Sequence, residues 1–587
     1  MISLSENARI ILKQRYLQRD HQGRVFETPE EMFARVARHV AAAEGIYRKS
    51  KDPAGTEQDF FEVMTDLDFL PNSPTLMNAG TRLGQLAACF VLPVPDSIRG
   101  IFRAVSEMAV IHQSGGGTGF SFSSLRPEGG VVKSTGGIAS GPVSFMRVFD
   151  QATDVVKQGG RRRGANMGIL SVHHPDIRTF IQAKENPDEF TNFNISVAVT
   201  DRFMKSVKSG GRIPLINPRT GKVEREENAS DLLDLMALTA WNTGDPGLFF
   251  VDEVNRKNPT PHLGWMEGTN PCGELPLYPY ESCNLGSINL LHMVRNGRVD
   301  YMKLKRIIGI GVRFLDNIID LNRYPFSGIK RMTLANRKIG LGIMGWADML
   351  IRLGLPYDSD KALGLAARLM KFVTREARAA SAELARERGA FPNFSTSLYK
   401  KKGLPPLRNA TVTTVAPTGT ISIIAGTSSG IEPNFAVSFI RHVLDGRDLM
   451  EFNPLFEDMA AKIMTPQLMD EIMGVGSIRN VRAVPKKIRD LFKTAMDIAP
   501  EAHLRVQAAF QRYTDNAVSK TVNLPEQATA RDVRKIFVMA HALKCKGVTV
   551  YRYGSKGNQV LNLMKQEPGS RVSVDQEFNG HCRICGI

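Results

Sequence analysis

Residues 86–94 read LAACFVLPV, a short apolar run of the kind that forms a buried strand, with a proline as its next-to-last residue. Similar runs recur at 248–254 (LFFVDEV), 410–417 (ATVTTVAP) and 547–553 (GVTVYRY). Segments with helical periodicity lie between them, near residues 142–158, 230–241, 361–388 and 530–544. Strands that alternate with helices predict an α/β body, built on a largely parallel sheet or barrel, from about Pro71 onward.

The residues before this body predict a small helical region. Ser3–Glu6 and Thr28–Glu31 both have the spacing of a capping box, and Pro29 suits the first helical position. Each box precedes apolar residues at helical spacing. We therefore expect residues 1–70 to be helical.

The other end of the chain predicts a tail. After Gly557 the sequence becomes polar, and it ends with the Cys-x-x-Cys pair Cys582 and Cys585. We expect a flexible segment, 557–587, that carries a dithiol, behind an α/β body at 71–556.

Composition argues against a membrane protein, a disulfide-rich secreted protein and a nucleic-acid-binding protein. The chain has 587 residues, of which 42% are hydrophobic and 23% charged, and its net charge is +17. The basic residues are spread among acidic ones on helix faces, which favours a solvated surface over a nucleic-acid site. We see no signal segment and no apolar run near ~18 residues, and six cysteines are too few for a disulfide scaffold. We expect a cytoplasmic protein that binds neither membrane nor nucleic acid.

The sequence NPCGE at 270–274 carries the chemistry. Pro271 and Gly273 exclude a helix, and in an extended chain Asn270, Cys272 and Glu274 would share one face. A carboxylate can accept a proton, an amide can bind an oxygen, and a thiol can act as nucleophile, reductant or radical carrier. A tight turn with a structural cysteine is the open alternative.

Other motifs are less decisive. Cys89 and Cys283 sit in apolar runs, and their spacing cannot show whether they meet. The hydroxyls of Thr418, Thr420 and Ser422 lie where a strand turns into a helix, which suits a phosphate. The glycine spacing G-x-G-x-x-G at 340–345 is followed by a helix and not by a second strand with an acidic end, so we interpret it as close packing and not as a dinucleotide site.

Eight motifs in order resemble the catalytic subunit of ribonucleotide reductases, and more narrowly the adenosylcobalamin-dependent class II enzymes. They are NSPTLMNAGT (72–81), ACFVLPVPDSI (88–98), GGGTGFSFSSLRP (115–127), NPCGE (270–274), CNLGSINL (283–290), IGLGIMGWAD (339–348), APTGTIS (416–422) and GIEPNF (430–435). The resemblance implies a ten-stranded α/β barrel with a central finger loop. It implies the reduction of ribonucleoside di- or triphosphates to deoxyribonucleotides, with the choice between the two left open.

The resemblance also implies roles for individual residues. Cys272 would be the thiyl radical that takes hydrogen from the ribose C3′, Glu274 the base for the 3′-hydroxyl, and Asn270 the group that holds the sugar oxygens. Cys89 and Cys283 would supply two electrons and become a disulfide. The tail pair, Cys582 and Cys585, would reduce this disulfide and be reduced in turn by a thioredoxin or glutaredoxin-type protein.

Binding residues follow from the same resemblance. The substrate would contact Ser73, Ala88, Cys89 and Gly117, with its phosphates on Pro417, Thr418, Gly419, Thr420 and Ile421. A deoxynucleotide effector would contact Asp96, Ser97, Arg126 and Lys133. We expect a homodimer.

The radical source is implied by what the sequence lacks. Relatives that receive a radical from a second subunit carry adjacent tyrosines, whereas Tyr551 and Tyr553 are separated here, and no glycyl-radical motif is present. Both features favour adenosylcobalamin. Two other classes stay open: a zinc-bearing nucleic-acid binder that uses His581, Cys582, Cys585 and perhaps Cys545, and a nucleotide-binding regulatory module without chemistry.

Overall fold

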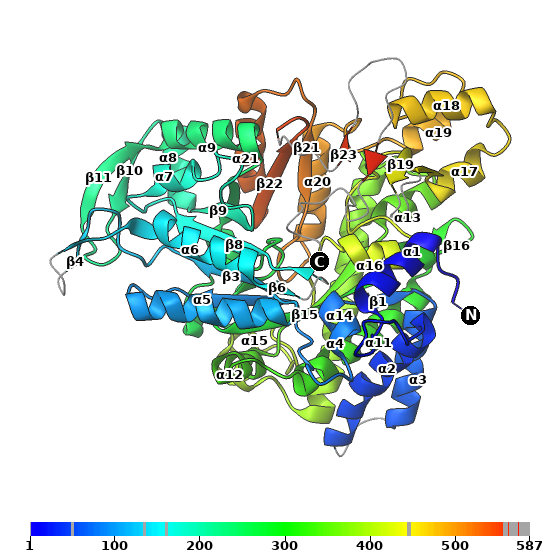
Figure 1. Ribbon diagram of the computed structural model, residues 1–587, viewed down its shortest axis with the longest axis horizontal. Coiled ribbons are helices and arrows are strands. Elements are labelled where there is room, and N and C mark those ends of the chain that lie inside the picture. The colour runs from blue at the N-terminus through cyan, green and yellow to red at the C-terminus, as the bar shows by residue number, and fades with distance from the viewer. Residues whose placement is uncertain are drawn as a thin grey trace.

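The computed structural model describes residues 2–47, 52–132, 137–158, 162–442 and 448–555, together with two short strands at 561–562 and 573–574. The first part is helical, as expected, with α1 (Glu6–Ile11), α2 (Pro29–Ala41) and α3 (Pro53–Thr65) (Figure 1). Thr28 and Glu31 form the predicted capping box of α2. Ser5, and not Ser3, caps α1, because the Ser5 hydroxyl accepts the amide of Ala8.

A ten-stranded sheet follows, in two halves that run in opposite directions. The first half contains five parallel neighbours: β2 (Cys89–Pro93), β3 (Gly117–Ser121), β8 (Asn166–Ser171), β9 (Phe193–Val199) and β12 (Gly247–Phe250). The second half contains β15 (Glu281–Asn289), β18 (Ile339–Met344), β21 (Thr521–Leu524) and β22 (Gly547–Arg552). Antiparallel pairs join the halves, β15 with β2 and β12 with β22, and β1 (Phe69–Pro71) adds to β15.

The segment 411–415 closes this sheet into a barrel. It was predicted as a strand, but it makes only single bridges, from Thr413 to Leu341 of β18 and from Val415 to Val518 ahead of β21. Glycines of β18 let it approach closely: a Cβ at Gly342 would lie 2.7 Å from the carbonyl oxygen of Thr414. The glycine spacing at 340–345 therefore serves packing, as predicted.

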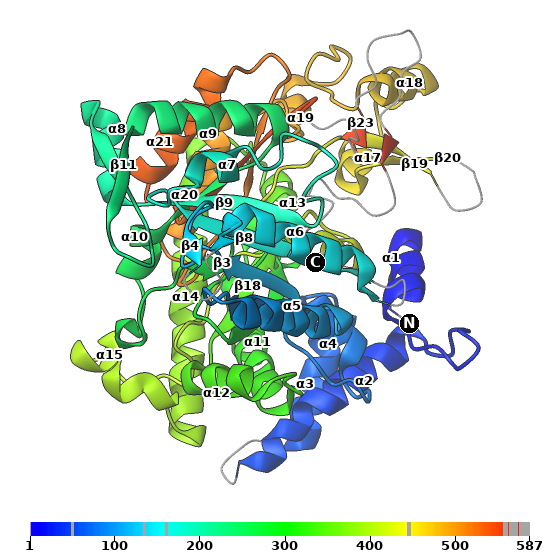
Figure 2. The ribbon, with the colours of Figure 1, turned by 60° about the vertical axis from the view of Figure 1, so that its left-hand side comes forward.

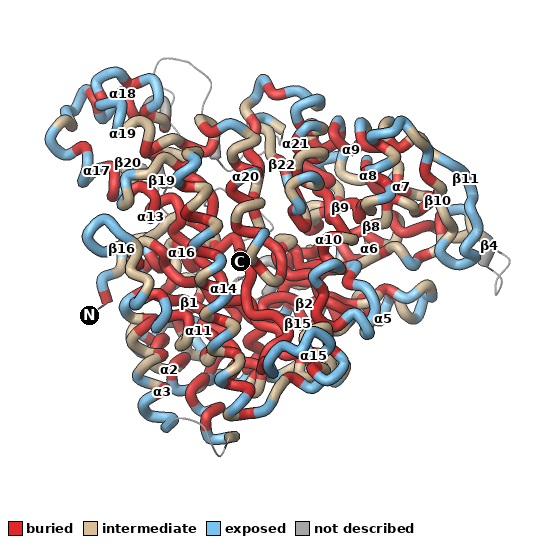
Figure 3. The backbone as a smooth tube through the Cα atoms, turned by 180° about the vertical axis from the view of Figure 1, so that it is seen from behind, coloured by how far each residue is buried: buried red, intermediate tan, exposed pale blue. Residues whose placement is uncertain are grey.

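Helices cover both halves of the barrel, whose central strands are buried (Figures 1 and 3). The first half packs on α5 (Ile98–Gln113), α6 (Gly141–Val155), α9 (Ala229–Thr243) and α21 (Ala530–Ala542), and the second on α11 (Tyr301–Leu321) and α14 (Asp360–Arg388). The four helices predicted from periodicity are thus confirmed to within three residues at each end. The run LFFVDEV is strand only to Phe250, because α10 (Val251–Arg256) begins inside it with two acidic residues in its first turn. Within the described residues, every helix is too short or too polar to cross a membrane.

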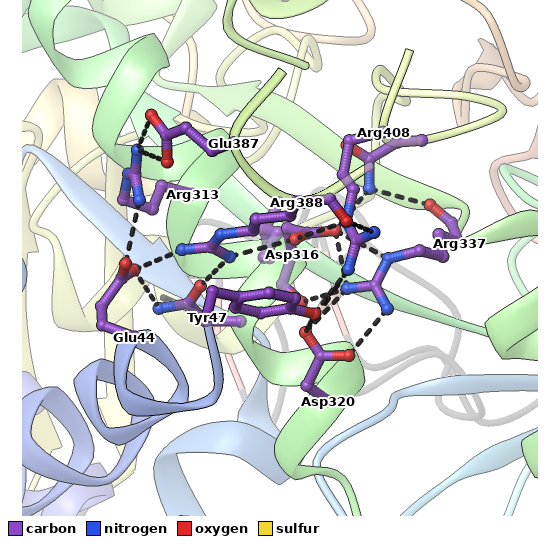
Figure 4. A network of polar contacts seen from close by, with 12 residues as sticks. Glu44, Tyr47, Arg313, Asp316, Asp320, Arg337, Glu387, Arg388 and Arg408 are labelled. Carbon is purple, nitrogen blue, oxygen red and sulfur yellow. Dashed lines mark hydrogen bonds and ion pairs between the residues drawn. The ribbon is translucent and has the colours of Figure 1, made fainter. Parts of the chain in front are cut away.

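A buried network of ion pairs joins the N-terminal helices to the second half of the barrel (Figure 4). Asp316 of α11 accepts bonds from Arg337, Arg388 and Arg408, and Glu44 pairs with Arg388 at 2.6 Å. Burial by itself would raise the pKa of Asp316, but the three guanidinium groups lower it to about 2. Buried charges persist only when they are paired, so this network fixes the helical region against the barrel.

An outlying subdomain, 436–498, stands at one end of the barrel (Figure 2). It consists of the hairpin β19 (Ser438–His442) and β20 (Asp448–Phe452) and of α17 (Pro454–Ala460), α18 (Pro466–Val475) and α19 (Lys486–Leu491). These elements pack around an apolar cluster that also includes Ile351. The described strands of the tail, β23 (Leu561–Asn562) and β24 (Ser573–Val574), extend the β19–β20 sheet. Cys582 and Cys585 lie outside the described residues.

Candidate active site

Residues 268–277 form a hairpin, the finger, that packs against the inner strands of the barrel. Its strands β13 (Gly268–Thr269) and β14 (Pro276–Leu277) are antiparallel, which leaves 270–275 at the tip. The tip is a tight turn, since Gly273 has a φ of +81° and its amide donates to the carbonyl of Asn270 at 3.1 Å. The premise of an extended chain was therefore wrong, because glycine allows a left-handed conformation that breaks the alternation of side chains.

Backbone contacts hold the finger in place. A Cβ at Gly119 of β3 would lie 1.8 Å from the carbonyl oxygen of Thr269, so only glycine allows the finger to pass this strand. On the other side, the carbonyl of Glu274 accepts the Thr414 hydroxyl and the Ala517 amide, both at 2.8 Å. The position of the tip is thus set by β3 on one side and by the segments around Thr414 and Ala517 on the other.

Glu274 is a buried carboxyl group whose surroundings favour its protonated form. It is 0% exposed, and neither carboxylate oxygen has a hydrogen-bond partner among the described residues. Burial raises the pKa of Glu274 to about 7, although the nearby Asn270 amide offsets part of that rise. A base with a pKa near the working pH is effective in general catalysis. Unsatisfied buried oxygens also indicate that this side chain faces a ligand.

Asn270 links the turn to the thiol of Cys89. Its Oδ1 accepts the amide of Leu275 at 3.0 Å, and its Nδ2 donates to Cys89 Sγ at 3.1 Å. The amide of Leu275 can only donate, so it fixes which end of the Asn270 side chain points toward the sulfur.

Cys89 and Cys283 lie directly opposite each other on two neighbouring strands of the barrel. They are register partners in the antiparallel pair β2–β15, and both are reduced. Directly opposed residues in such a pair have Cα atoms about 4.5–5.5 Å apart, which is within the range of about 4.4–6.8 Å for disulfides. The sequence left open whether these thiols meet. The structure brings them together without any movement of the backbone.

Cys272 differs from these two thiols in its exposure. It is half-buried, whereas Cys89 is 0% and Cys283 1% exposed. Beside it, a Cβ at Gly273 would meet no atom within 4 Å, so space remains next to the tip. Cys272 is therefore more accessible than the buried pair to a reagent outside the finger.

The predicted substrate residues fall in two groups. Ala88, Cys89 and Gly117 lie together, since Gly117 is the register partner of Cys89 and its amide donates to the Ala88 carbonyl at 2.8 Å. Ser73 lies at the start of α4 (Ser73–Asn78), with its hydroxyl 2.8 Å from that of Tyr16.

The predicted phosphate loop, 417–421, leads into α16 (Gly419–Ile424). Thr418 has a φ of +57°, and its hydroxyl accepts the amide of Gly430 at 2.7 Å. This hydroxyl therefore fixes the loop itself. Thr420 and Ile421 are buried at 6% and 5% exposure.

Two of the predicted effector residues, Asp96 and Arg126, are paired with each other. Arg126 and Asp96 form an ion pair at 2.9 Å, and the Ser97 hydroxyl caps α5 by accepting the amide of Gly100. Lys133 lies outside the described residues.

One buried pair beside Cys283 was missed by sequence reasoning. Lys338 Nζ lies 2.7 Å from Glu281 Oε2, and both side chains are almost fully buried. Cys283 Sγ donates to the carbonyls of Lys338 and Asn284, each at 3.4 Å. The signal was present, because Glu281 precedes Cys283 by two residues and so lies on the same face of a strand.

The described residues hold no cluster of metal-ligating side chains. Cys545, one of the thiols considered for zinc, is fully buried, and burial raises its pKa to about 12. A buried thiol with a raised pKa is unreactive and a poor metal ligand. His581 and the two tail cysteines lie outside the described residues.

Comparisons with known proteins agree over most of the chain. The family "Ribonucleotide reductase, all-alpha domain" matches residues 2–84, and "Ribonucleotide reductase, barrel domain" matches 87–407 and 405–551. The chain is 51% identical over 584 residues to the vitamin B12-dependent ribonucleoside-diphosphate reductase of Mycobacterium tuberculosis strain H37Rv, covering 99% of this chain and 82% of that protein. It is 46% identical over 655 residues to the protein of that name from Thermoplasma acidophilum, covering 99% and 85%.

A solved structure agrees in fold. The class Id ribonucleotide reductase alpha subunit of Actinobacillus ureae superposes with a TM-score of 0.78 at 24% identity, covering 94% of this chain and 97% of that chain. The predicted barrel with a helical N-terminal region is confirmed.

Proposed function

The chain belongs to the ribonucleotide reductase family, and we infer that it reduces ribonucleotides to 2′-deoxyribonucleotides in a vitamin B12-dependent reaction. The relatives from M. tuberculosis and T. acidophilum, whose names state this activity, cover 99% of the chain. Their names also favour diphosphates over triphosphates as substrates. The observation that supports the chemistry is the finger, whose Asn270 contacts Cys89 and whose Glu274 acts electrostatically on Cys283, the register partner of Cys89. The comparisons give no support to a zinc-bearing nucleic-acid binder or to a module without chemistry.

We assign the acid–base work to Glu274. A ribose whose 3′-hydroxyl faces the finger tip would meet a buried carboxylate that has no hydrogen bond from the described part of the chain and a pKa of about 7. Glu274 would take the 3′-hydroxyl proton while Cys272, as a thiyl radical, takes the C3′ hydrogen. Asn270 would hold the sugar oxygens.

The reducing equivalents would come from Cys89 and Cys283. The C2′–O bond breaks, the hydroxyl leaves as water, and the two thiols lose two electrons and two protons as their sulfurs join. Their register across β2 and β15 supports this role, because the disulfide needs no backbone rearrangement.

The implied cofactor is adenosylcobalamin. When it is bound, it supplies the radical that Cys272 needs. The residues fit such a group: Cys272 is the half-buried thiol of the three, and the space beside Gly273 leaves the tip approachable. Glu274 and Asn270 remain shielded from water on the inner side of the tip, as radical chemistry requires.

The remaining binding roles rest on the same proposal. Ser73, Ala88 and Gly117 would line the substrate, and the loop 417–421 would receive its phosphates. Asp96, Ser97, Arg126 and Lys133 would form a deoxynucleotide effector site, in which the effector's phosphates compete with Asp96 for Arg126.

We propose two protein partners and a cytoplasmic location, where nucleotides and thiol reductants are available. A thioredoxin or glutaredoxin-type protein would reduce the tail pair. A second copy of the chain would dock on α5 and α6, which lie beside each other on the surface (Figure 2). Exposed apolar side chains support this docking face: Ile98 is 62%, Phe102 50% and Val155 82% exposed.

An activity assay tests the proposal. Purified protein is given each ribonucleoside di- and triphosphate and a dithiol, with and without adenosylcobalamin, and deoxynucleotides are measured. We expect product only with adenosylcobalamin, and faster with diphosphates. Product formation without it, supported by a metal-loaded second protein, would overturn the assignment.

A further inference from the structure

The two buried thiols differ in the polar groups that surround them. Cys89 Sγ accepts a hydrogen bond from Asn270 Nδ2 at 3.1 Å. Cys283 Sγ instead donates, to the carbonyls of Lys338 and Asn284 at 3.4 Å. One sulfur therefore faces an N–H group and the other faces carbonyl oxygens.

This difference affects which sulfur can carry a negative charge. A thiolate is stabilised by a donor, and the Asn270 amide is held in place because its Oδ1 is already bound to the Leu275 amide. A thiolate on Cys283 would face two carbonyl oxygens and the nearby carboxylates of Glu281 and Glu274. Burial and those carboxylates raise the pKa of the Cys283 thiol, with Lys338 acting in the opposite direction.

Disulfide exchange depends on the leaving sulfur. When a thiolate attacks a disulfide, one sulfur forms the new bond and the other departs with the electron pair, faster when its thiolate is more stable. Resting on the proposed function, we propose that the Cys89–Cys283 disulfide formed in each turnover is reduced in one direction, by attack on Cys283, with Asn270 holding the departing Cys89 thiolate.

The step balances in atoms and electrons. The sulfur of an incoming dithiol bonds to Cys283 Sγ as the Cys283–Cys89 bond breaks, and the electron pair leaves on Cys89. The second sulfur of the dithiol then attacks the first, and Cys283 departs. Cys89 and Cys283 each end with one of the two protons that the dithiol gives up. The dithiol ends as a disulfide, and Asn270 acts as a positioning residue for a step separate from substrate reduction.

The test maps the first bond formed. The enzyme is oxidised with diamide, given a short pulse of the monothiol 2-mercaptoethanol and quenched in acid with a thiol-alkylating agent. Peptide mass mapping then locates the mixed disulfide. We expect the adduct on Cys283 and the alkyl group on Cys89, by a ratio of about tenfold or more, as a hydrogen bond to a charged group allows.

Two variants separate this role from a structural one. Asn270→Asp keeps the acceptor for Leu275 but removes the N–H donor, and it should abolish or reverse the preference. Asn194→Ala removes a side-chain amide of β9 that donates to the Pro271 carbonyl of the finger at 2.9 Å, and it should keep the preference.

The outcomes separate the two proposals. An adduct mainly on Cys89, or a preference for Cys283 that survives in Asn270→Asp, would overturn the direction of exchange and leave the reductase assignment intact. Failure of diamide to join Cys89 to Cys283 would count against both, because the pair would then not be redox-active.

Discussion

Glu274→Gln should make the protein more stable and at the same time nearly inactive. Burial raises the pKa of Glu274 to about 7 from an ordinary 4.5. The folded state therefore holds this proton more tightly than the unfolded chain does, so the free energy of unfolding falls as the pH rises from about 4.5 to 7. A tenfold difference in proton affinity is about 1.4 kcal/mol, so the full loss amounts to roughly 3 kcal/mol. Glutamine keeps the shape and removes this cost.

Urea unfolding at pH 5 and pH 8 measures the effect. The free energy of unfolding of Glu274→Gln minus that of the unaltered protein should be about 2–3 kcal/mol larger at pH 8 than at pH 5. The reason is that the Glu274 carboxyl is mostly protonated in the folded protein at pH 5 and ionised at pH 8. Glu457→Gln, on the exposed face of α17, is the matched control and should show no such growth. The rate of deoxynucleotide formation should fall by about 10²–10⁴-fold. A stability difference that is equal at both pH values would refute the buried ionisation, and a loss of rate below about tenfold would refute the role of Glu274 as base.

Four further changes test other parts of the structure. Cys272→Ser should abolish product formation while substrate binding, measured by calorimetry, stays nearly unchanged, because a hydroxyl cannot replace the thiyl radical; substantial turnover would disprove the radical role. Cys582→Ser with Cys585→Ser should stop repeated turnover with thioredoxin but keep a single turnover of pre-reduced enzyme, and normal cycling would show that the tail is not the shuttle. Gly119→Ala should prevent the finger from seating, and it should lower the melting temperature and remove activity together; a stable, active variant would contradict the close approach. The pKa of Asp316 is lowered to about 2, so its ionised form should stabilise the fold fully above the ordinary pKa of 3.8, and this contribution should be lost as the pH falls towards 2. The free energy of unfolding of Asp316→Asn should therefore depend less on pH between about 4 and 2.

Sequence reasoning predicted what depends on local pattern. Helices such as α14 follow from apolar periodicity, and the start of α2 follows from the capping box at Thr28. The identity of the reactive residues in the finger also came from the sequence, through its motifs.

What sequence reasoning missed depends on tertiary contacts. The left-handed Gly273 makes the tip a turn, although Pro271 and Gly273 were equally compatible with an extended chain. The pairing of Cys89 with Cys283 is a matter of register between two residues that lie 194 positions apart in the sequence, which no local pattern specifies. The segment 411–415 has the composition of a strand, yet it pairs through isolated bridges, since its partners are set by the closure of the barrel.

The closing segment, residues 411–415, also determines at what stage of folding Glu274 reaches its final position. The carbonyl of Glu274 accepts bonds from Thr414 on the closing segment and from Ala517 on the chain leading to β21, so it spans the last seam of the barrel. Barrel closure and the positioning of Glu274 therefore depend on each other. A chain whose barrel has not closed lacks the contacts that hold Glu274 in place. On the proposed roles, an incompletely folded molecule would therefore hold its thiols without a correctly positioned base. Closure of the barrel and positioning of Glu274 are therefore coupled, and we expect no reactivity before the barrel has closed.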